Sequence, residues 1–218
     1  HNRACIDETL CIKCGMCRKS CPYGAIIENI RPCERACELG ALHADSNRRA
    51  IIDYDKCVQC GACINACPFG AIGERTYIVQ VIQEIRRGKE VMALIAPSIE
   101  GQFGVGVSLN QIISAIKVLG FENVYETAEG AEITARNEAR EFKESVIERH
   151  EKFLTTSCCP AFVSMIRTNF GDSVTHISKT VSPMATIANV VKKKHPDAIL
   201  VFIGPCAAKK TEALEYTT

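Results

Sequence analysis

The sequence predicts an α+β module over residues 1–75, followed by an α/β domain over residues 76–218 in which helices cover a parallel sheet. Eleven of the 14 cysteines fall in the first 75 residues, where helical periodicity is weak. From about Thr76 onward, short apolar runs that are typical of buried strands alternate with amphipathic helices. Strands that alternate with helices favour a parallel sheet with both faces covered.

The elements of the second domain follow from apolar periodicity and from residues that end helices. A helix that contains Tyr77, Val81 and Ile85 should end at Gly88, and Val91–Ala96 should form a buried strand. The other elements expected, in chain order, are a helix at 109–119, a strand at 121–125, a helix at 128–150, a strand at 153–156, helices at 160–170 and 183–194, a strand at 198–203 and a helix from 207.

The bulk composition excludes several classes of partner. With 26 basic and 25 acidic residues, the net charge of +1 gives no general attraction to nucleic acid or anionic lipid. No apolar run approaches the ~20 residues of a membrane span, and the polar start is not a signal peptide. The cysteine density without a secretory signal indicates metal rather than disulfides, in a reducing cytoplasm. Because the chain starts without methionine and stops within an apparent helix, we expect it to be a piece of a longer protein.

One pattern, C-x-x-C-G-x-C-x-x-x-C-P-x-G-A-I, occurs at residues 11–26 and again at residues 57–72. This is the bacterial ferredoxin run, in which three thiolates hold one cubane and the cysteine before proline reaches the other cluster. Zinc needs only two C-x-x-C pairs and has no use for the third cysteine or for Cys-Pro. We therefore expect a ferredoxin-like module with two 4Fe–4S clusters. One would be held by Cys11, Cys14, Cys17 and Cys67, and the other by Cys57, Cys60, Cys63 and Cys21.

Three further cysteines of this half, Cys5, Cys33 and Cys37, lie outside the two runs. Three thiols are one short of a cubane, so a third 4Fe–4S cluster would need a ligand upstream of His1. The alternative is that they are buried or adventitious cysteines, because free cysteine often packs as a small hydrophobic residue. The sequence leaves both possibilities open.

A second set of motifs follows the predicted strands. The motif T-S-C-C-P occupies residues 156–160, G-P-C-A-A-K-K-T-E occupies residues 204–212, and A-P-S occupies residues 96–98. Each lies at a strand-to-helix junction, which is where open α/β folds bind their ligands. Two strand ends therefore deliver cysteines to what we expect to be one crevice.

These motifs, in this order and behind a two-cluster ferredoxin, resemble the catalytic domain of iron-only (FeFe) hydrogenases over essentially the whole chain. The resemblance implies the hydrogenase catalytic fold and the reversible reduction of protons to H₂, with electron transfer from a redox partner such as ferredoxin in an anaerobic setting. It also implies an H-cluster, which is a 4Fe–4S cubane joined through a shared cysteine to a di-iron unit with CO, cyanide and azadithiolate ligands.

The resemblance assigns roles around that cofactor. Cys159 and Cys206 would be ligands of the cubane, and Cys158 would be the free thiol that passes protons to the bridge amine. Lys209 would donate to one cyanide, while Ser98 with Pro97 would line the other.

The family's proton path uses two glutamates three residues apart and a serine, which Glu138, Glu141 and Ser178 match. Glu212 matches the glutamate of the second motif. Two glutamates at this spacing share one face of a helix. Taken alone, however, Glu138 and Glu141 are better explained as solvated charges on a highly charged helix than as a proton path.

The chain departs from the family pattern in three places. The family completes its H-cluster site with a C-x-x-x-C pair, and no such pair follows Cys206. We therefore expect a missing C-terminal portion or a second subunit to supply it, and this fragment alone to be inactive. Gly204 replaces a usual methionine and Phe162 a common tryptophan, which indicates a divergent branch.

Two alternative functions remain. One is a non-catalytic, hydrogenase-like iron–sulfur assembly factor or a redox or H₂ sensor, and the other is a ferredoxin-type carrier fused to an inert domain. Cys158, Lys209 and the glutamates favour the enzyme, because a scaffold needs no proton path.

Overall fold

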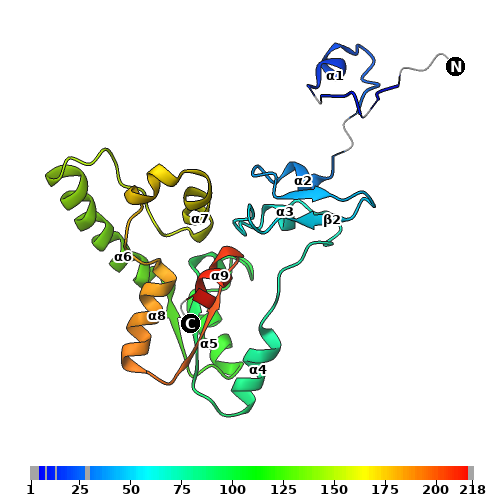
Figure 1. Cartoon of the computed structure of the whole chain (residues 1–218). Coiled ribbons are helices and arrows are strands. Elements are labelled where there is room, and N and C mark those ends of the chain that lie inside the picture. Colours follow the sequence, from blue (N-terminus) through cyan, green and yellow to red (C-terminus); the bar gives the residue numbers. More distant parts are fainter. Residues whose placement is uncertain (1–4, 8, 13, 28–29, 216–218) are drawn as a thin grey trace.

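The computed structural model describes residues 5–7, 9–12, 14–27 and 30–215 (Figure 1). The cysteine-rich part, residues 5–75, contains α1 (Met16–Ser20), α2 (Pro32–Arg35), β1 (Leu42–Ala44), β2 (Ala50–Ile52) and α3 (Ala62–Asn65). The C-terminal part, residues 76–215, begins with α4 (Ile78–Arg86), β3 (Val91–Ile95), the 3-10 turn η1 (Pro97–Ile99), α5 (Leu109–Val118), β4 (Asn123–Glu126) and α6 (Thr127–Phe142). It continues with the π-helical turn η2 (Lys143–Glu148), α7 (Pro160–Asn169), the 3-10 turn η3 (Gly171–His176), α8 (Pro183–Lys194), β5 (Ile199–Ile203) and α9 (Ala208–Glu215).

A three-stranded parallel sheet lies at the centre of the C-terminal part, in the order β4-β3-β5. All five residues of β3 are buried, as expected for a strand covered on both faces. Ile95 at the end of β3 pairs with Glu126 of β4 and with Ile203 of β5. The carboxyl ends of the three strands therefore meet at one edge of the sheet.

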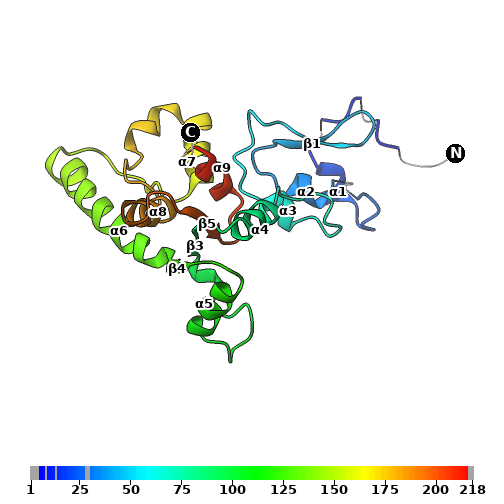
Figure 2. The same ribbon diagram turned by 90° about the horizontal axis from the view of Figure 1, so that it is seen from below.

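Helices cover both faces of this sheet, which confirms the layering expected from the sequence. Ile112 and Ile116 of α5, together with partly buried residues of α4, pack against one face. Ile187 and Val191 of α8 pack against the other. Figure 2 shows α8 and α5 on opposite sides of the strands.

Helix α6 lies against α8 at a glycine. A Cβ atom on Gly130 would overlap the carbonyl oxygen of Pro183 and lie 3.1 Å from the Cβ of Ile187. The start of α8 is fixed by Ser182, whose side chain accepts a hydrogen bond from the Ala185 N–H at 3.3 Å. The close contact sets the position of α6, the helix that carries the two candidate glutamates.

Two expected elements differ from the structure. The strand expected at 153–156 is a single bridge between Thr155 and Ile177, outside the three-stranded sheet, and Phe153 stacks on the ring of His176 instead. The helix expected over 128–150 changes to π-helical geometry after Phe142. There the buried Ser145 donates its hydroxyl to the Glu141 carbonyl at 2.8 Å, a bond to the preceding turn that bends helices.

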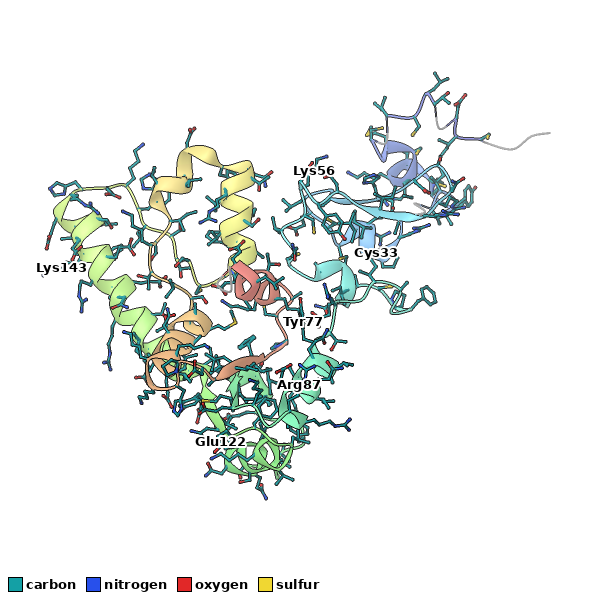
Figure 3. All side chains as sticks on the ribbon, turned by 60° about the horizontal axis from the view of Figure 1, so that its bottom comes forward. Cys33, Lys56, Tyr77, Arg87, Glu122 and Lys143 are labelled. Carbon is teal, nitrogen blue, oxygen red and sulfur yellow. The ribbon has the colours of Figure 1, made fainter. Side chains whose placement is uncertain are left out.

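The cysteine-rich part is built on a short hairpin, in which β1 and β2 are antiparallel and Leu42 pairs with Ile52. Helices α2 and α3 contact each other beside it. Cys33 of α2 is buried and lies within this part (Figure 3). Helix α1 lies farther from the C-terminal part than α2 and α3 do (Figure 1). Among the described residues, no helix has the length and apolar character needed to cross a membrane.

Candidate functional site

Two of the predicted motifs leave the sheet side by side. The Ala96 N–H donates to the Ile203 carbonyl at 2.9 Å, so the A-P-S motif after β3 and the G-P-C motif after β5 begin at adjacent strand ends. Pro97 and Ser98 are exposed in η1. The structure therefore brings these motifs to one edge, as the strand order of the sequence suggested.

The glycine of the G-P-C motif has a steric cause. A Cβ atom on Gly204 would lie 2.6 and 2.7 Å from the Cζ and Cε1 atoms of Phe202, and 3.0 Å from the Cβ of Ala96. Real Cβ atoms do not approach that closely. The Phe202 ring therefore occupies the space that a side chain at position 204 would need.

A nearly buried lysine joins the two cysteine motifs. The ammonium of Lys209 in α9 donates to the Cys158 carbonyl at 2.9 Å and to Oε2 of Glu212 at 2.8 Å. The Lys209 and Glu212 side chains are only 12% and 11% exposed. These bonds hold the first turn of α9, and with it the Cys206 segment, against the T-S-C-C-P motif.

The cysteines of these motifs are accessible. Cys158 and Cys206 are partly exposed and Cys159 is exposed. Cys159 is the residue before α7, which begins at Pro160, a residue type that favours the first position of a helix. The helix start thus presents two adjacent thiols beside a fixed cation.

Glu138 of α6 is bonded to the same motif. The Thr156 hydroxyl donates to Oε1 of Glu138 at 2.8 Å, and the Ser157 N–H donates to the same oxygen at 3.2 Å. The Cys158 N–H in turn donates to Oγ1 of Thr156 at 3.4 Å. One hydroxyl therefore separates the Glu138 carboxylate from the Cys158 backbone.

Glu141, one turn further along α6, is bonded to the next loop. The buried Ser178 hydroxyl donates to Oε2 at 2.6 Å, the Lys179 N–H to Oε1 at 3.0 Å, and the Thr180 hydroxyl to Oε2 at 3.3 Å. Burial acts to raise the pKa of Glu141, but these donors and the Lys179 charge together lower it. Glu141 is therefore held as a carboxylate.

The two loops are also joined to each other, because the Ser157 hydroxyl donates to the Thr180 carbonyl. Glu138 and Glu141 are thus partly buried acceptors, not the solvated charges that the sequence alone allowed. Sequence reasoning did not identify Ser157, Thr180 or the Thr156 hydroxyl as partners. The only sequence signal for these three residues was that they lie within or next to the named motifs. Which of them bonds to which glutamate depends on how α6 packs on α8.

The second ferredoxin run lies against the C-terminal part. Cys57, Cys60 and Cys63 line a hollow of about 730 Å³ whose other side is formed by residues of α7, α9 and the turn before α9: Ala161, Phe162, Met165, Ala207, Lys210, Thr211 and Leu214. Burial raises the pKa of the Cys63 thiol, and the charges of Cys57 and Cys60 raise it further against opposing backbone N–H groups. The three thiols of the second run thus line one hollow.

This donor set suits a cluster rather than a single ion. In the described part of the chain, no three His, Cys, Asp or Glu side chains converge enough to hold one metal ion. A cubane is bound at its corners, so its thiolates stand farther apart, around a cavity. Cys57, Cys60 and Cys63 around a hollow fit that requirement.

Polar contacts join the two parts beside the hollow. The Lys210 ammonium pairs with Glu74 at 2.9 Å and donates to the Arg75 carbonyl at 2.7 Å. The Thr211 hydroxyl donates to the side chain of Gln59, which stands within the second run. The second run is thereby attached to α9, the helix that also holds the Cys158 segment.

The first run is arranged differently. Cys11, Cys14 and Cys17 are exposed around α1, as is Cys5. Cys21 follows α1, and Cys67 follows α3 at the corresponding place. Each of these two sulfurs accepts a hydrogen bond from the N–H four residues later, at 3.4 and 3.3 Å respectively. Backbone N–H groups lower the pKa of both thiols, chiefly that of Ala25 at Cys21 and those of Phe69 and then Ala71 at Cys67. The structure does not bring the first run to the hollow.

The comparisons with known proteins agree with these motifs. Residues 89–218 match the family "iron only hydrogenase large subunit, C-terminal domain", and residues 4–27 and 50–73 match the 4Fe-4S binding domain. The chain is 33% identical to the periplasmic [Fe] hydrogenase large subunit of Nitratidesulfovibrio vulgaris, over 96% of this chain and 51% of that protein. It is 29% identical to the NADP-reducing hydrogenase subunit HndD of Solidesulfovibrio fructosivorans, over 95% of this chain and 31% of that protein.

Two further matches cover a smaller share of the chain. Iron hydrogenase 1 of Clostridium pasteurianum is 27% identical over 57% of this chain and 24% of that protein. The nuclear prelamin A recognition factor of Xenopus laevis is 28% identical over 58% of this chain and 32% of that protein. The chain thus spans about half the length of the first relative and about a quarter to a third of the others. With its matching domain over residues 89–218, it belongs to the iron-only hydrogenase large-subunit family, with ferredoxin-type cluster motifs in front.

Proposed function

We propose that this chain is the electron-transfer module and the first part of the catalytic domain of an FeFe hydrogenase, with a boundary near residue 75. The reaction would be 2H⁺ + 2e⁻ ⇌ H₂. The observation that carries the proposal is the convergence of Lys209 and Glu138 on the Cys158 segment, through bonds of 2.9 Å to its carbonyl and 2.8 Å to Thr156. A ferredoxin fused to an inert domain would not need this convergence.

The residues present fit an H-cluster. Cys159 and Cys206 would be its cubane ligands from this chain, and Lys209 is a nearly buried cation beside them. The cofactor, when bound, supplies the redox metal at which protons and electrons combine. A cation fixed in advance in a site that excludes water stabilises anionic ligands strongly, and Lys209 would have this role. Before the cofactor binds, the Glu212 carboxylate balances the charge of Lys209.

The chain's own groups can hold and move protons beside this site. The Cys158 thiol would carry the proton at its sulfur. Glu138 accepts from the Thr156 hydroxyl, which in turn accepts from the Cys158 backbone N–H, so Glu138 is held at the segment that carries this thiol and would exchange protons with it directly or through water. Glu141 and the Ser178 hydroxyl form the next pair, at 2.6 Å. Because the pKa of Glu141 is lowered, its carboxylate would accept a proton only transiently.

Electrons would enter through the cysteine-rich module. The hollow beside Phe162, Met165 and Ala207 puts the second ferredoxin run next to the catalytic domain, so its cluster would be the last carrier before the active site. A ferredoxin-type protein would be the external partner. The compartment expected from the sequence, the cytoplasm, stays a prediction, since one relative is a periplasmic hydrogenase subunit.

Hydrogen evolution by the full-length, matured protein with a reduced ferredoxin-type donor tests this function. We expect H₂ together with infrared bands of metal-bound CO and cyanide. Glu138→Gln should lower the rate by about a hundredfold or more while leaving those bands in place. The control is Glu132→Gln on the same helix, which removes an exposed carboxylate and should not change the rate.

If the matured protein gave no H₂ and showed no infrared bands, the proposal would be contradicted and the assembly-factor alternative favoured. Bands without H₂ would favour a sensor. A Glu138→Gln protein with an unchanged rate would remove Glu138 from the proton path while leaving the hydrogenase function intact.

A further inference from the structure

The linker between the two ferredoxin runs contains half of a third run. Residues 33–42 read C-x-x-x-C-x-x-G-A-L, and the two full runs end in C-x-x-x-C-P-x-G-A-I at residues 17–26 and 63–72. Cys33 thus stands where a third cysteine of a run would stand, and Cys37 where a fourth would. Two positions of the pattern differ: Glu38 replaces the proline after the last cysteine, and Leu42 replaces the final isoleucine.

The backbone repeats as well. The fourth-position cysteines, Cys37 and Cys67, each donate their N–H to the carbonyl three residues earlier at 3.2 Å. Each is preceded by a helical turn, α2 or α3, and followed by a glycine whose N–H bonds back to the cysteine carbonyl, at 3.0 Å for Gly40 and 3.3 Å for Gly70. These two glycines have φ of 62° and 60°, a left-handed conformation that favours glycine. Residues 31–44 and 50–72 therefore form two similar halves around the β1–β2 hairpin.

The hairpin register brings Cys37 to the second run. Cys37 precedes Leu42, the first residue of β1, by five positions, and Cys57 follows Ile52, the last residue of β2, by five. Leu42 and Ile52 are paired, and the Asp53 N–H extends the ladder by donating to the Ala41 carbonyl at 2.7 Å. Leu42 and Ile52 are the pair at the open end of this antiparallel hairpin. Cys37 and Cys57, five residues outside that pair, therefore lie at the same end of the hairpin.

The hollow described above confirms this placement, because Cys37 lines it together with Cys57, Cys60 and Cys63. Cys21 is not among the residues that line it. Cys21 belongs to the α1 loop, which lies beyond α2 and α3 in Figure 1. The cysteine that the usual ferredoxin order would assign to this cluster is therefore the one held farther away.

We propose that Cys37, supplied by the linker, is the fourth ligand of the 4Fe–4S cluster held by Cys57, Cys60 and Cys63, in place of Cys21. This rests on the proposed function only in that the second run binds a cubane. Cys37 would lose its thiol proton and ligate one iron as a thiolate, with no change of oxidation state. The cluster beside the catalytic domain would then be held entirely within residues 31–67.

The test uses the full chain with the first run removed by Cys11→Ala, Cys14→Ala and Cys17→Ala, purified without oxygen and loaded with iron and sulfide. Cys37→Ala and Cys21→Ala are compared in this background by iron and sulfide content and by electron paramagnetic resonance. Cys37→Ala should remove about one iron per cluster and give the signal of a 3Fe–4S cluster when oxidised. Cys21→Ala should keep the iron content and the 4Fe–4S signal of the background.

The proposal would be overturned if iron were lost from Cys21→Ala but not from Cys37→Ala. It would also be overturned if both variants lost iron, or if both kept the 4Fe–4S signal. If Cys37→Ala loses all its iron, Cys37→Ser separates ligation from folding. A serine oxygen can ligate iron, so Cys37→Ser should recover part of the iron. A purely structural position would tolerate alanine at least as well as serine, and that order would also overturn the proposal. A chain with every cysteine intact that binds no cubane would instead contradict the proposed function.

Discussion

The two parts of this molecule are stabilised in different ways. In the C-terminal part, residues 91–96 are buried throughout, and α5 and α8 close over the two faces of the sheet. In the cysteine-rich part, the buried apolar residues among those described are Cys33, Ala41 and Leu42. Apolar burial is the dominant favourable contribution to folding, so it can account for the stability of the C-terminal part but not for that of the cysteine-rich part.

The aromatic residues of the cysteine-rich part show the same difference. Tyr23 and Phe69, which follow the two Cys-Pro pairs, are 90% and 89% exposed. Small domains without an adequate core rely on disulfides or metal, and metal-binding free energy then becomes folding free energy. The fold of the C-terminal part therefore follows from its apolar pattern, whereas we expect that of the cysteine-rich part to depend on bound clusters.

The largest expected effect is therefore from removing iron. When a chelator strips iron from the reduced protein without oxygen, the amides of residues 5–75 should lose their protection from hydrogen exchange. Little apolar burial remains there to keep this part folded. Amides of β3, in the buried centre of the sheet, should keep their slow exchange. Hydrogen exchange measured by mass spectrometry before and after chelation tests this. Equal loss of protection in β3, or retained protection in β1 and β2, would contradict the comparison.

The second effect concerns the packing that positions the glutamates. Gly130→Ala should destabilise the C-terminal part by about 1–3 kcal/mol, because the added methyl group overlaps the Pro183 carbonyl and forces α6 away from α8. Urea unfolding followed by circular dichroism measures the loss. The matched control is Gly171→Ala, where a Cβ atom would meet nothing within 4 Å, with an expected change within about 0.5 kcal/mol. Equal effects would mean that the α6–α8 contact is not tight.

The sequence predicted those features of the fold that depend on local signals. For α8 it predicted the observed bounds, because Ser182 and Pro183 are residue types that start helices and the apolar spacing continues to Val191, followed by lysines in the last turn. Val91–Ala96 was predicted as a buried strand because its apolar run is continuous, and β3 occupies Val91–Ile95. In contrast, the strand predicted at 153–156 has only two apolar residues, and Phe153 stacks on His176, a partner 23 residues away that no local pattern indicates.

The candidate site shows the same limit. The motifs predicted which residues to examine, and Glu138, Ser178 and Lys209 lie where hydrogen bonds connect the motif loops. Which donors meet each carboxylate depends on the packing of α6 on α8, a long-range contact. Cys37 was expected from the sequence only as a ligand of a third cluster or as an adventitious thiol. The half run around it is present in the sequence, but its position beside the second run depends on the hairpin register.

A third, smaller effect should appear at Glu141. Its folded-state pKa is lowered below the ordinary 4.5, so its contribution to stability is present above pH 4.5 and is lost as the pH falls through the folded pKa. Glu141→Gln should cost about 1 kcal/mol at pH 7 and should flatten the acid side of the stability profile. Urea midpoints from pH 7 down to acid pH measure both. Glu132→Gln, which removes an exposed carboxylate from the same helix, should leave the profile unchanged.

The smallest effect should come from the ion pair that joins the two parts. Glu74 and Lys210 are 48% and 34% exposed, so Glu74→Gln should cost less than about 1 kcal/mol, and the cost should shrink further in high salt. Lys210 keeps its bond to the Arg75 carbonyl at 2.7 Å, which the substitution does not remove. Urea unfolding at low and high salt measures the change. A loss of several kcal/mol that persists in salt would mean that the two parts stabilise each other through this contact, and their separate origins of stability would then no longer hold.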